Sequence, residues 1–141
     1  MTNKTFAIIK PDAIKNQYTG LIYDRILKKG FKVLGAKLLK MTKQQAEGFY
    51  FIHKERPFFE ELTTFMSSET CMVLALEKEN AVISWRETIG ATNPKEANQG
   101  TIRKDFANSL SENAVHGSDS NENAEKEIAF FFTDSELIAN H

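Results

Sequence analysis

The sequence predicts an α+β fold, a ferredoxin-like four-stranded antiparallel sheet with helices packed on it. Short runs of β-branched, aromatic and aliphatic residues alternate with segments whose apolar residues recur at helical spacing, which gives four strands separated by helices. No internal repeat or low-complexity tract interrupts this alternation. The 141 residues suit one domain, which we expect to span residues 1–141, with the helices covering one face of the sheet.

The first third of the chain supplies two strands and one helix. Residues 5–9 are β-branched, aromatic or aliphatic, and Pro11 ends this strand because it has no N–H for a sheet hydrogen bond. Residues 20–29 carry leucine and isoleucine at helical spacing, and Gly30 stands where a C-terminal cap is expected. Residues 31–39 are rich in Val, Leu and Phe and predict the second strand.

The middle of the chain predicts two helices and the third strand. Thr42 is the expected N-cap of a helix that Pro57 terminates. Residues 58–66 begin another helix, and residues 70–76 form a nearly continuous apolar run that is typical of a buried strand. The buried stripe of the first helix is expected to consist of Ala46, Phe49, Tyr50 and Ile52.

The last third predicts a helix over residues 80–89 and then a long irregular stretch over residues 90–112. Long segments without periodicity inside a compact domain usually carry function, so we expect this one to contribute to a site. Residues 113–116 predict a short fourth strand, and Ser120 caps the final helix. The apolar positions of that helix are Ala124, Ile128, Phe131 and Phe132.

Charge and composition exclude several classes of protein. The 18 basic and 19 acidic side chains give a net charge of −1, which argues against a nucleic-acid or anionic-membrane binder because both need a positive field. The single cysteine, Cys71, lies in an apolar run, which favours a buried thiol and a reducing compartment. The N-terminal apolar run is too short for a signal peptide or membrane span, so we expect a cytoplasmic protein.

One of the three histidines is placed differently from the others. His116 follows the apolar residues 114–115 and precedes residues 117–119, Gly-Ser-Asp, so its imidazole should emerge where a strand ends and a turn begins. Taken alone, a histidine in such a place is more often packed than reactive. We expect His53 and His141 to be solvated.

At this point the chain resembles the nucleoside diphosphate kinases. The residues that carry the resemblance are Asn-Ala-Val-His-Gly-Ser-Asp at 113–119, which looks like the family's signature around its phosphorylated histidine. Four more segments agree in order and spacing, from Lys10 to the final helix. They are Ile-Lys-Pro-Asp at 9–12, Arg-Pro-Phe-Phe at 56–59, Ala-Thr-Asn-Pro at 91–94 and Gly-Thr-Ile-Arg at 100–103.

The resemblance implies a ping-pong reaction in which a nucleoside triphosphate, mainly ATP, phosphorylates His116, and the phosphohistidine then phosphorylates a nucleoside diphosphate. His116, Glu127 and Lys10 are the implied catalytic residues, with Glu127 bonded to the second ring nitrogen of the histidine. A neutral imidazole is required, and an ordinary pKa of about 6.5 leaves most of it unprotonated at pH 7. Mg²⁺ is expected on the phosphates with mostly water around it, with Asp119 reaching it through water and no protein ligand cage.

The resemblance also implies a nucleotide site of broad base specificity. Guanidinium and ammonium groups suit phosphate oxygens, and an aromatic ring stacks on any base with little preference. A site without polar groups at the base edge cannot reject one base strongly, so purine and pyrimidine, ribo and deoxy nucleotides should all be accepted. Tyr50 stays open between the nucleotide cleft and the core. The implied nucleotide-binding residues are Lys10, Phe58, Arg86, Thr92, Arg103, Leu110 and Asn113.

Two other functions remain as alternatives. A non-catalytic nucleotide-binding regulatory module would keep the stacking and phosphate-binding residues but would not need His116 at a turn. A serine-centred phosphotransferase would use Ser118 instead. The family also implies a homo-oligomer, for which we expect a homotetramer, with a homohexamer as the alternative, because the chain stops soon after the final helix.

Overall fold

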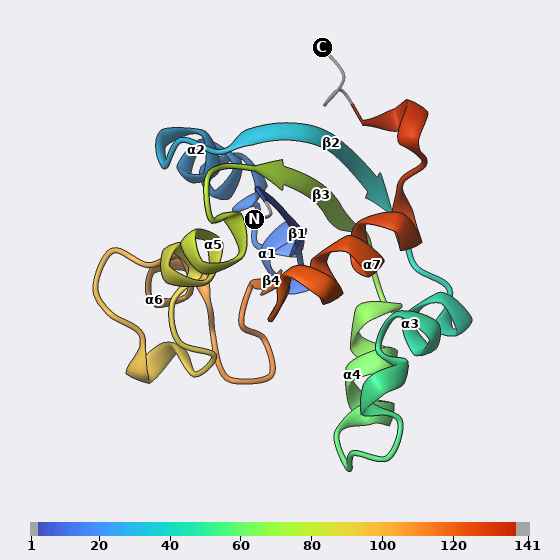
Figure 1. Cartoon of the computed structure of the whole chain (residues 1–141). Helices are drawn as coiled ribbons and strands as arrows, with labels where there is room; N and C mark the ends of the chain where they lie inside the picture. The colour runs from blue at the N-terminus through green and yellow to red at the C-terminus, as the bar shows by residue number, and fades with distance from the viewer. Residues whose placement is uncertain (1–2, 138–141) are drawn as a thin grey trace.

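The computed structural model describes residues 3–137 and contains the predicted sheet. Its strands are all antiparallel and lie in the order β2-β3-β1-β4, which confirms the ferredoxin-like arrangement (Figure 1). The bounds are Lys4–Ile9 for β1, Lys32–Leu39 for β2, Cys71–Glu77 for β3 and Val115–Gly117 for β4.

Seven α-helices and three short 3₁₀ turns connect the strands within residues 3–137. The α-helices are α1 Pro11–Lys15, α2 Thr19–Lys28, α3 Lys43–Phe49, α4 Phe59–Met66, α5 Ala81–Ile89, α6 Ile102–Phe106 and α7 Asn121–Phe131. The 3₁₀ turns are η1 Phe51–His53, η2 Pro94–Glu96 and η3 Asp134–Glu136.

Caps set the ends of the helices largely as the sequence predicts. The Thr42 hydroxyl accepts from the Gln45 N–H at 3.0 Å and the Gln45 side chain accepts from Thr42 N–H, a reciprocal capping box. Ser120 caps α7 by accepting from the Asn123 N–H at 3.0 Å. Gly30, with φ of +90°, follows the end of α2, where a left-handed residue is needed to turn the chain into β2.

Two sequence predictions about local structure are wrong. Residues 90–112 are not wholly irregular, because Asn93 caps the 3₁₀ turn η2 and Thr101 caps the short helix α6. Both elements are too short to show periodicity in the sequence. Ile52 is not part of a buried stripe: α3 ends at Phe49, so Ile52 falls in η1 and is 71% exposed. The helix α1, which starts at Pro11, was not predicted either.

Helices cover both faces of the sheet, not one face as expected (Figure 1). Alternate residues of β1 point into two separate apolar cores, so the strand is buried on both sides. One core contains Ala7 and Ile9 with apolar residues of α1, α2, α5 and α6. The other contains Phe6 and Ile8 with those of α3, α4 and α7.

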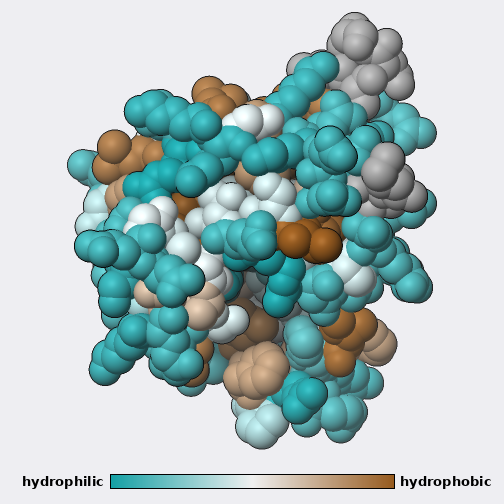
Figure 2. Space-filling view, turned by 60° about the vertical axis from the view of Figure 1, so that its left-hand side comes forward, coloured by the Kyte–Doolittle hydropathy of each residue, from teal (hydrophilic) through white to brown (hydrophobic). Residues whose placement is uncertain are grey.

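The short strand β4 lies at one edge of the sheet, beside β1, and presents His116 opposite Ile8. The face shown in Figure 2 is largely hydrophilic, with apolar side chains gathered around a hollow in its lower half. Within residues 3–137, no helix has the length and apolar composition needed to cross a membrane.

Candidate active site

His116 is held from one side by a carboxylate, which a serine hydroxyl holds in turn. Its Nε2 lies 2.8 Å from Glu127 Oε1, on α7, and the imidazole is 17% exposed. Ser118 Oγ donates to the same Glu127 oxygen at 2.8 Å. Because the carboxylate can only accept, Nε2 carries the proton, and Nδ1 is left with its lone pair free for nucleophilic attack.

Burial lowers the pKa of His116 below its ordinary value, and the nearby charges of Lys10 and Arg103 lower it further. The hydrogen bond to Glu127 and its negative charge oppose this shift without cancelling it. At neutral pH the imidazole is therefore uncharged, which is the form that can attack an electrophile.

Three aromatic rings pack around the imidazole. The rings of Phe6, Phe49 and Tyr50 lie edge-on or tilted to it, with centroid distances of 6.0, 5.4 and 6.2 Å. Tyr50 is buried, its hydroxyl has no hydrogen-bond partner among residues 3–137, and burial raises the pKa of Tyr50. Tyr50 thus packs in the core, against the imidazole, and its hydroxyl stays protonated.

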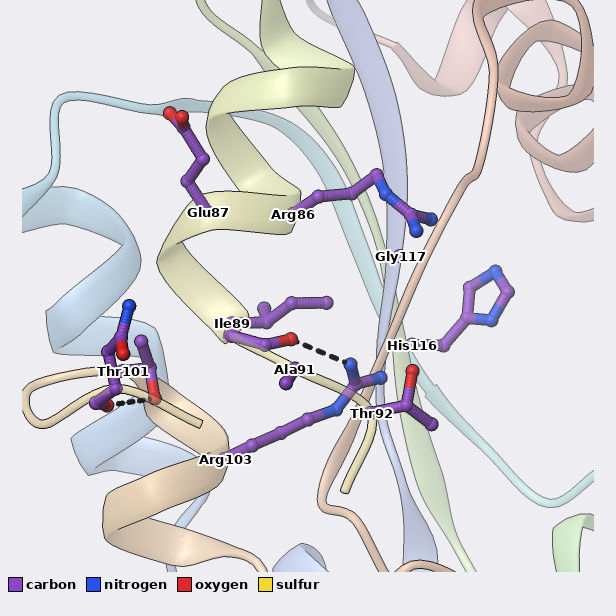
Figure 3. A pocket seen from close by; sticks show the side chains of 11 residues that line it. Arg86, Glu87, Ile89, Ala91, Thr92, Thr101, Arg103, His116 and Gly117 are labelled. Atoms are coloured by element: carbon purple, nitrogen blue, oxygen red, sulfur yellow. Dashed lines mark hydrogen bonds between the residues drawn. The ribbon is translucent and has the colours of Figure 1, made fainter. Parts of the chain in front are cut away.

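Two guanidinium groups and the imidazole face one cleft of about 600 Å³ (Figure 3). Arg86 comes from α5, Arg103 from α6 and His116 from β4, and the Thr92 side chain lies near the Arg103 guanidinium. Three elements that are distant in the sequence therefore bring positive charge and a nucleophile to one space. The cleft is lined by Arg86, Glu87, Ile89, Gly90, Ala91, Thr92, Asn98, Thr101, Arg103, His116 and Gly117.

Backbone carbonyls fix the guanidinium of Arg103. Its Nε, Nη1 and Nη2 donate to the carbonyl oxygens of Asn113, Gly90 and Val115 at 3.3, 3.1 and 2.9 Å. Burial and the charge of Arg86 lower the pKa of Arg103 to about 10, so it stays charged at neutral pH. Two of its five N–H groups remain for an anion.

Lys10 and Asn113 form a buried pair beside this cation. Lys10 Nζ donates to Asn113 Oδ1 at 2.8 Å, and the Asn113 amide nitrogen lies 3.5 Å from the carbonyl oxygen of Thr92. Burial lowers the pKa of Lys10 to about 8, helped by the charge of Arg103 and opposed by that of Asp12. The structure thus brings together the five predicted residues Lys10, Arg103, Asn113, His116 and Glu127.

Four of the predicted nucleotide-binding residues do not line this cleft. Two of them, Lys10 and Asn113, form the buried pair described above. The other two are Phe58 and Leu110. Their side chains are 47% and 57% exposed, and the Phe58 ring lies 5.5 Å from that of His53. His53 is only partly exposed, whereas full exposure was expected. Phe59, the residue after Phe58, packs against the apolar core. His141 lies outside the described residues.

Asp12 and Trp85 also hold the backbone of the site and are not among the predicted site residues. Asp12 Oδ2 accepts from the backbone N–H of Ala114 at 3.0 Å, and Ala114 has a φ of +72°, which is rare for a residue with a side chain. Trp85 Nε1 donates to the carbonyl oxygen of His116 at 3.1 Å. Asp12 does belong to the segment 9–12 that carries the resemblance, but its contact with Ala114 depends on the backbone path around the histidine, as does that of Trp85.

Two further titratable side chains, Cys71 and Asp119, do not line the cleft. Cys71 is buried, and burial raises the pKa of its thiol to about 11, so it stays protonated. Asp119 is exposed after β4, and its Oδ1 accepts from Asn123 at 2.6 Å. Across residues 3–137 there is no cluster of three or more His, Cys, Asp or Glu side chains that could hold a metal ion.

Comparison with known proteins gives consistent matches. Residues 3–137 match the family model described as nucleoside diphosphate kinase. The nucleoside diphosphate kinase of Geotalea uraniireducens is 58% identical over 135 residues, which cover 96% of this chain and 98% of that protein. The protein of the same name from a Wolbachia strain of Drosophila simulans is 57% identical, covering 96% of this chain and 97% of its own.

Solved structures agree with the sequence matches. The Aquifex aeolicus nucleoside diphosphate kinase superposes with a TM-score of 0.96 at 40% identity, covering 98% of this chain and all of the other. The Halobacterium salinarum enzyme, solved in complex with CDP, gives a TM-score of 0.92 at 36% identity, covering 98% of this chain and 92% of its own.

Proposed function

The chain belongs to the nucleoside diphosphate kinase family and is therefore a phosphotransferase that acts on nucleotides, and from this premise we propose how its residues perform the reaction. A nucleoside triphosphate, mainly ATP, transfers its γ-phosphoryl group to His116, and the phosphohistidine passes it to a nucleoside diphosphate. The observation that carries this proposal is the His116–Glu127 pair facing a cleft with two guanidinium groups.

In the first half-reaction the lone pair of His116 Nδ1 forms a bond to the γ-phosphorus while the bond from that phosphorus to the bridging oxygen breaks. The nucleoside diphosphate leaves with the electron pair of that oxygen. The second half-reaction is the reverse with another diphosphate, so one site serves both. Glu127 stabilises the positive charge that develops on the ring, because its carboxylate accepts from Nε2 at 2.8 Å.

Charge neutralisation is assigned to the cations of the cleft. Phosphoryl transfer leaves the protein little covalent work besides positioning the phosphates and stabilising charge on the equatorial oxygens. Arg86 and the two uncommitted N–H groups of Arg103 suit those oxygens, and the Thr92 hydroxyl and the Lys10 ammonium add further donors. Lys10 and Asn113, already bonded to each other, would also bind the ribose hydroxyl.

A divalent cation fits this site only when it is bound to the phosphates of the substrate. Mg²⁺ on the triphosphate would supply additional charge neutralisation, and a ligand shell of phosphate oxygens and water is what this ion prefers. Asp119, an exposed carboxylate next to β4, is the residue we assign to hold that shell through water. The absence of an acidic cluster within residues 3–137 accords with this choice.

Broad base specificity is proposed from Phe58 and Leu110, two exposed apolar side chains that do not line the cleft. The Phe58 ring offers a face for stacking, which is worth about 1–3 kcal/mol per base with little preference between bases, and Leu110 would cover the other face of the base. The Halobacterium salinarum relative is described in complex with CDP, a pyrimidine diphosphate, which supports pyrimidines among the substrates here.

We also propose a single domain over residues 1–141 and a homotetramer, with a homohexamer as the alternative to be resolved by analytical ultracentrifugation.

Incubation with ATP labelled at the γ-phosphate tests the mechanism. We expect rapid, acid-labile incorporation that chases into a nucleoside diphosphate and disappears in His116→Ala, while the matched control His53→Ala keeps it. Acid-stable label lost in Ser118→Ala would favour the serine-centred reaction. No label in a folded wild-type protein that still binds ADP would favour a non-catalytic nucleotide-binding module.

A further inference from the structure

Trp85 connects the helix that carries Arg86 to the strand that carries His116. It is the single tryptophan of the chain and is fully buried. Its indole Nε1 donates to the backbone carbonyl oxygen of His116 at 3.1 Å. The next residue along α5 is Arg86, which faces the cleft (Figure 3). One side chain thus touches the peptide of the nucleophile and adjoins the residue that supplies a phosphate-binding cation.

The indole leaves no space for a side chain at the residue after the nucleophile. A Cβ built on Gly117 would lie 2.8 Å from Trp85 Cδ1 and 3.1 Å from Ile89 Cδ1, distances that real Cβ atoms avoid. The backbone of β4 therefore approaches α5 as closely as the ring permits. On its other side the indole meets the Phe31 ring edge-on, with centroids 5.6 Å apart.

Packing alone does not account for this arrangement. An aliphatic side chain could fill the same volume, whereas the indole also has a donor, and that donor is committed to the carbonyl of the residue that reacts. The hydrogen bond fixes the position of the His116 carbonyl, and the absence of a side chain at Gly117 lets the backbone of β4 lie directly against the indole. Rates of group transfer fall steeply when reacting groups are misplaced by about 1 Å.

We propose that Trp85 is a positioning residue for phosphoryl transfer: its indole N–H holds the His116 peptide against α5, so that the imidazole and the Arg86 guanidinium keep their relative placement in the cleft. This inference rests on the proposed function, because it concerns the reaction at His116. It assigns Trp85 no contact with the nucleotide.

The test compares Trp85→Phe, which keeps an aromatic ring and removes the donor, with Phe31→Leu, which disturbs the packing of the same indole and keeps the donor. The rate constant for His116 phosphorylation is measured in a single turnover, with the Kd for ADP and the Tm measured separately. We expect Trp85→Phe to lower the rate constant about 3- to 10-fold, the range for one lost neutral hydrogen bond, and to leave Kd within about twofold. Phe31→Leu should lower the Tm and leave the rate constant unchanged.

Two results would overturn the inference: a phosphorylation rate in Trp85→Phe equal to that of the wild type, or an equal loss of rate in Phe31→Leu. Either is distinct from failure of the proposed function, in which the wild type itself forms no phosphohistidine. If Trp85→Phe fails to fold, the chain labelled with 5-fluorotryptophan serves instead, because it has one such site. Its fluorine resonance should shift on phosphorylation of His116, and an unchanged resonance would count against the proposal.

Discussion

At the scale of single residues, the hydrogen bond between His116 and Glu127 determines both the tautomer and the charge of the nucleophile. Glu127 raises the pKa of His116 by its hydrogen bond and its charge, yet burial and the neighbouring cations outweigh both. The Glu127 carboxylate therefore stabilises the positive charge that develops on the ring during the reaction, while the imidazole stays neutral beforehand.

Glu127→Gln separates these effects. The amide oxygen can still accept from Nε2, but the charge is lost, so we expect the phosphorylation rate to fall about 5- to 30-fold, the difference between a charged and a neutral hydrogen bond. The pKa of His116, followed by NMR of its ring protons, should fall further. Glu125→Gln, which changes an exposed carboxylate of the same helix, is the control. A His116 pKa that stays the same or rises would contradict the assignment.

Two titrations should bound the pH dependence of kcat/KM. His116 has a pKa below 6.5, so activity should persist as the pH falls through 6.5 and decline only below that value, when the ring gains a proton. Lys10 has a pKa of about 8, so activity should decline above pH 8, when the ammonium loses its proton.

Lys10→Arg tests the alkaline limb, because a guanidinium stays charged across this range. We expect a lower maximum, owing to the larger group, with no decline near pH 8 in a pH profile of kcat/KM. Persistence of the same alkaline limb would show that another group titrates there.

Lys10 also makes the free energy of unfolding depend on pH. The unfolded chain binds the Lys10 proton more tightly than the folded chain, so the free energy of unfolding should increase as the pH rises from about 8 toward 10.5.

At the scale of elements, the turn that leads into β4 is held by a buried carboxylate. Ala114 has a φ of +72°, its N–H donates to Asp12 Oδ2 at 3.0 Å, and its carbonyl accepts from the Lys10 N–H at 2.8 Å. Burial raises the pKa of Asp12, while the bond from Ala114 and the charge of Lys10 oppose the shift. The segment 10–12 thereby sets the backbone conformation two residues before the nucleophile.

Substitutions of Asp12 should separate its acceptor from its charge. Asp12→Ala leaves the buried Ala114 N–H without a partner and should lower the free energy of unfolding by about 1–3 kcal/mol in urea. Asp12→Asn keeps an acceptor oxygen and should lose much less. Ala114→Gly, which relieves a positive φ, is the matched test of strain and should be neutral or stabilising. Equal losses in the two Asp12 variants would contradict this reasoning.

The elements themselves were largely predictable from the sequence, and the exceptions have identifiable causes. Thr42 and Ser120 are caps with a local signal, so α3 and α7 begin where predicted. The position of Trp85 against His116 depends on how α5 packs on β4, and no local pattern encodes that. The site residues came from motifs, whereas the carbonyls that hold Arg103 come from a backbone path that only the structure reveals.

At the scale of the whole molecule, the sheet is buried on both faces, and the prediction of one covered face was wrong. The run Phe-Ala-Ile-Ile in β1 lacks the alternation of polar and apolar residues that a half-exposed strand would show. A continuous apolar run is therefore the physical sign of burial on both sides. The edge position of β4 leaves its histidine next to the cleft while its neighbour β1 lies inside.

Nucleotide binding should stabilise the whole fold, because the cleft joins α5, α6 and β4. ADP at a hundred times its Kd should add about 2.7 kcal/mol and raise the Tm by about 6–10 °C in thermal unfolding. Adenosine, which offers no phosphate to Arg86 and Arg103, should stabilise far less at the same concentration. Equal stabilisation by adenosine would place the nucleotide elsewhere.

The three carbonyl contacts of Arg103 have an evolutionary consequence. Its guanidinium donates to the carbonyl oxygens of Gly90, Asn113 and Val115, so replacement by an uncharged side chain would loosen the intervening loop and remove a cation in the same event. A related protein that lost catalytic activity through such a substitution of Arg103 would therefore also lose the order of its cleft. Loss of activity with retention of shape would have to begin at another side chain.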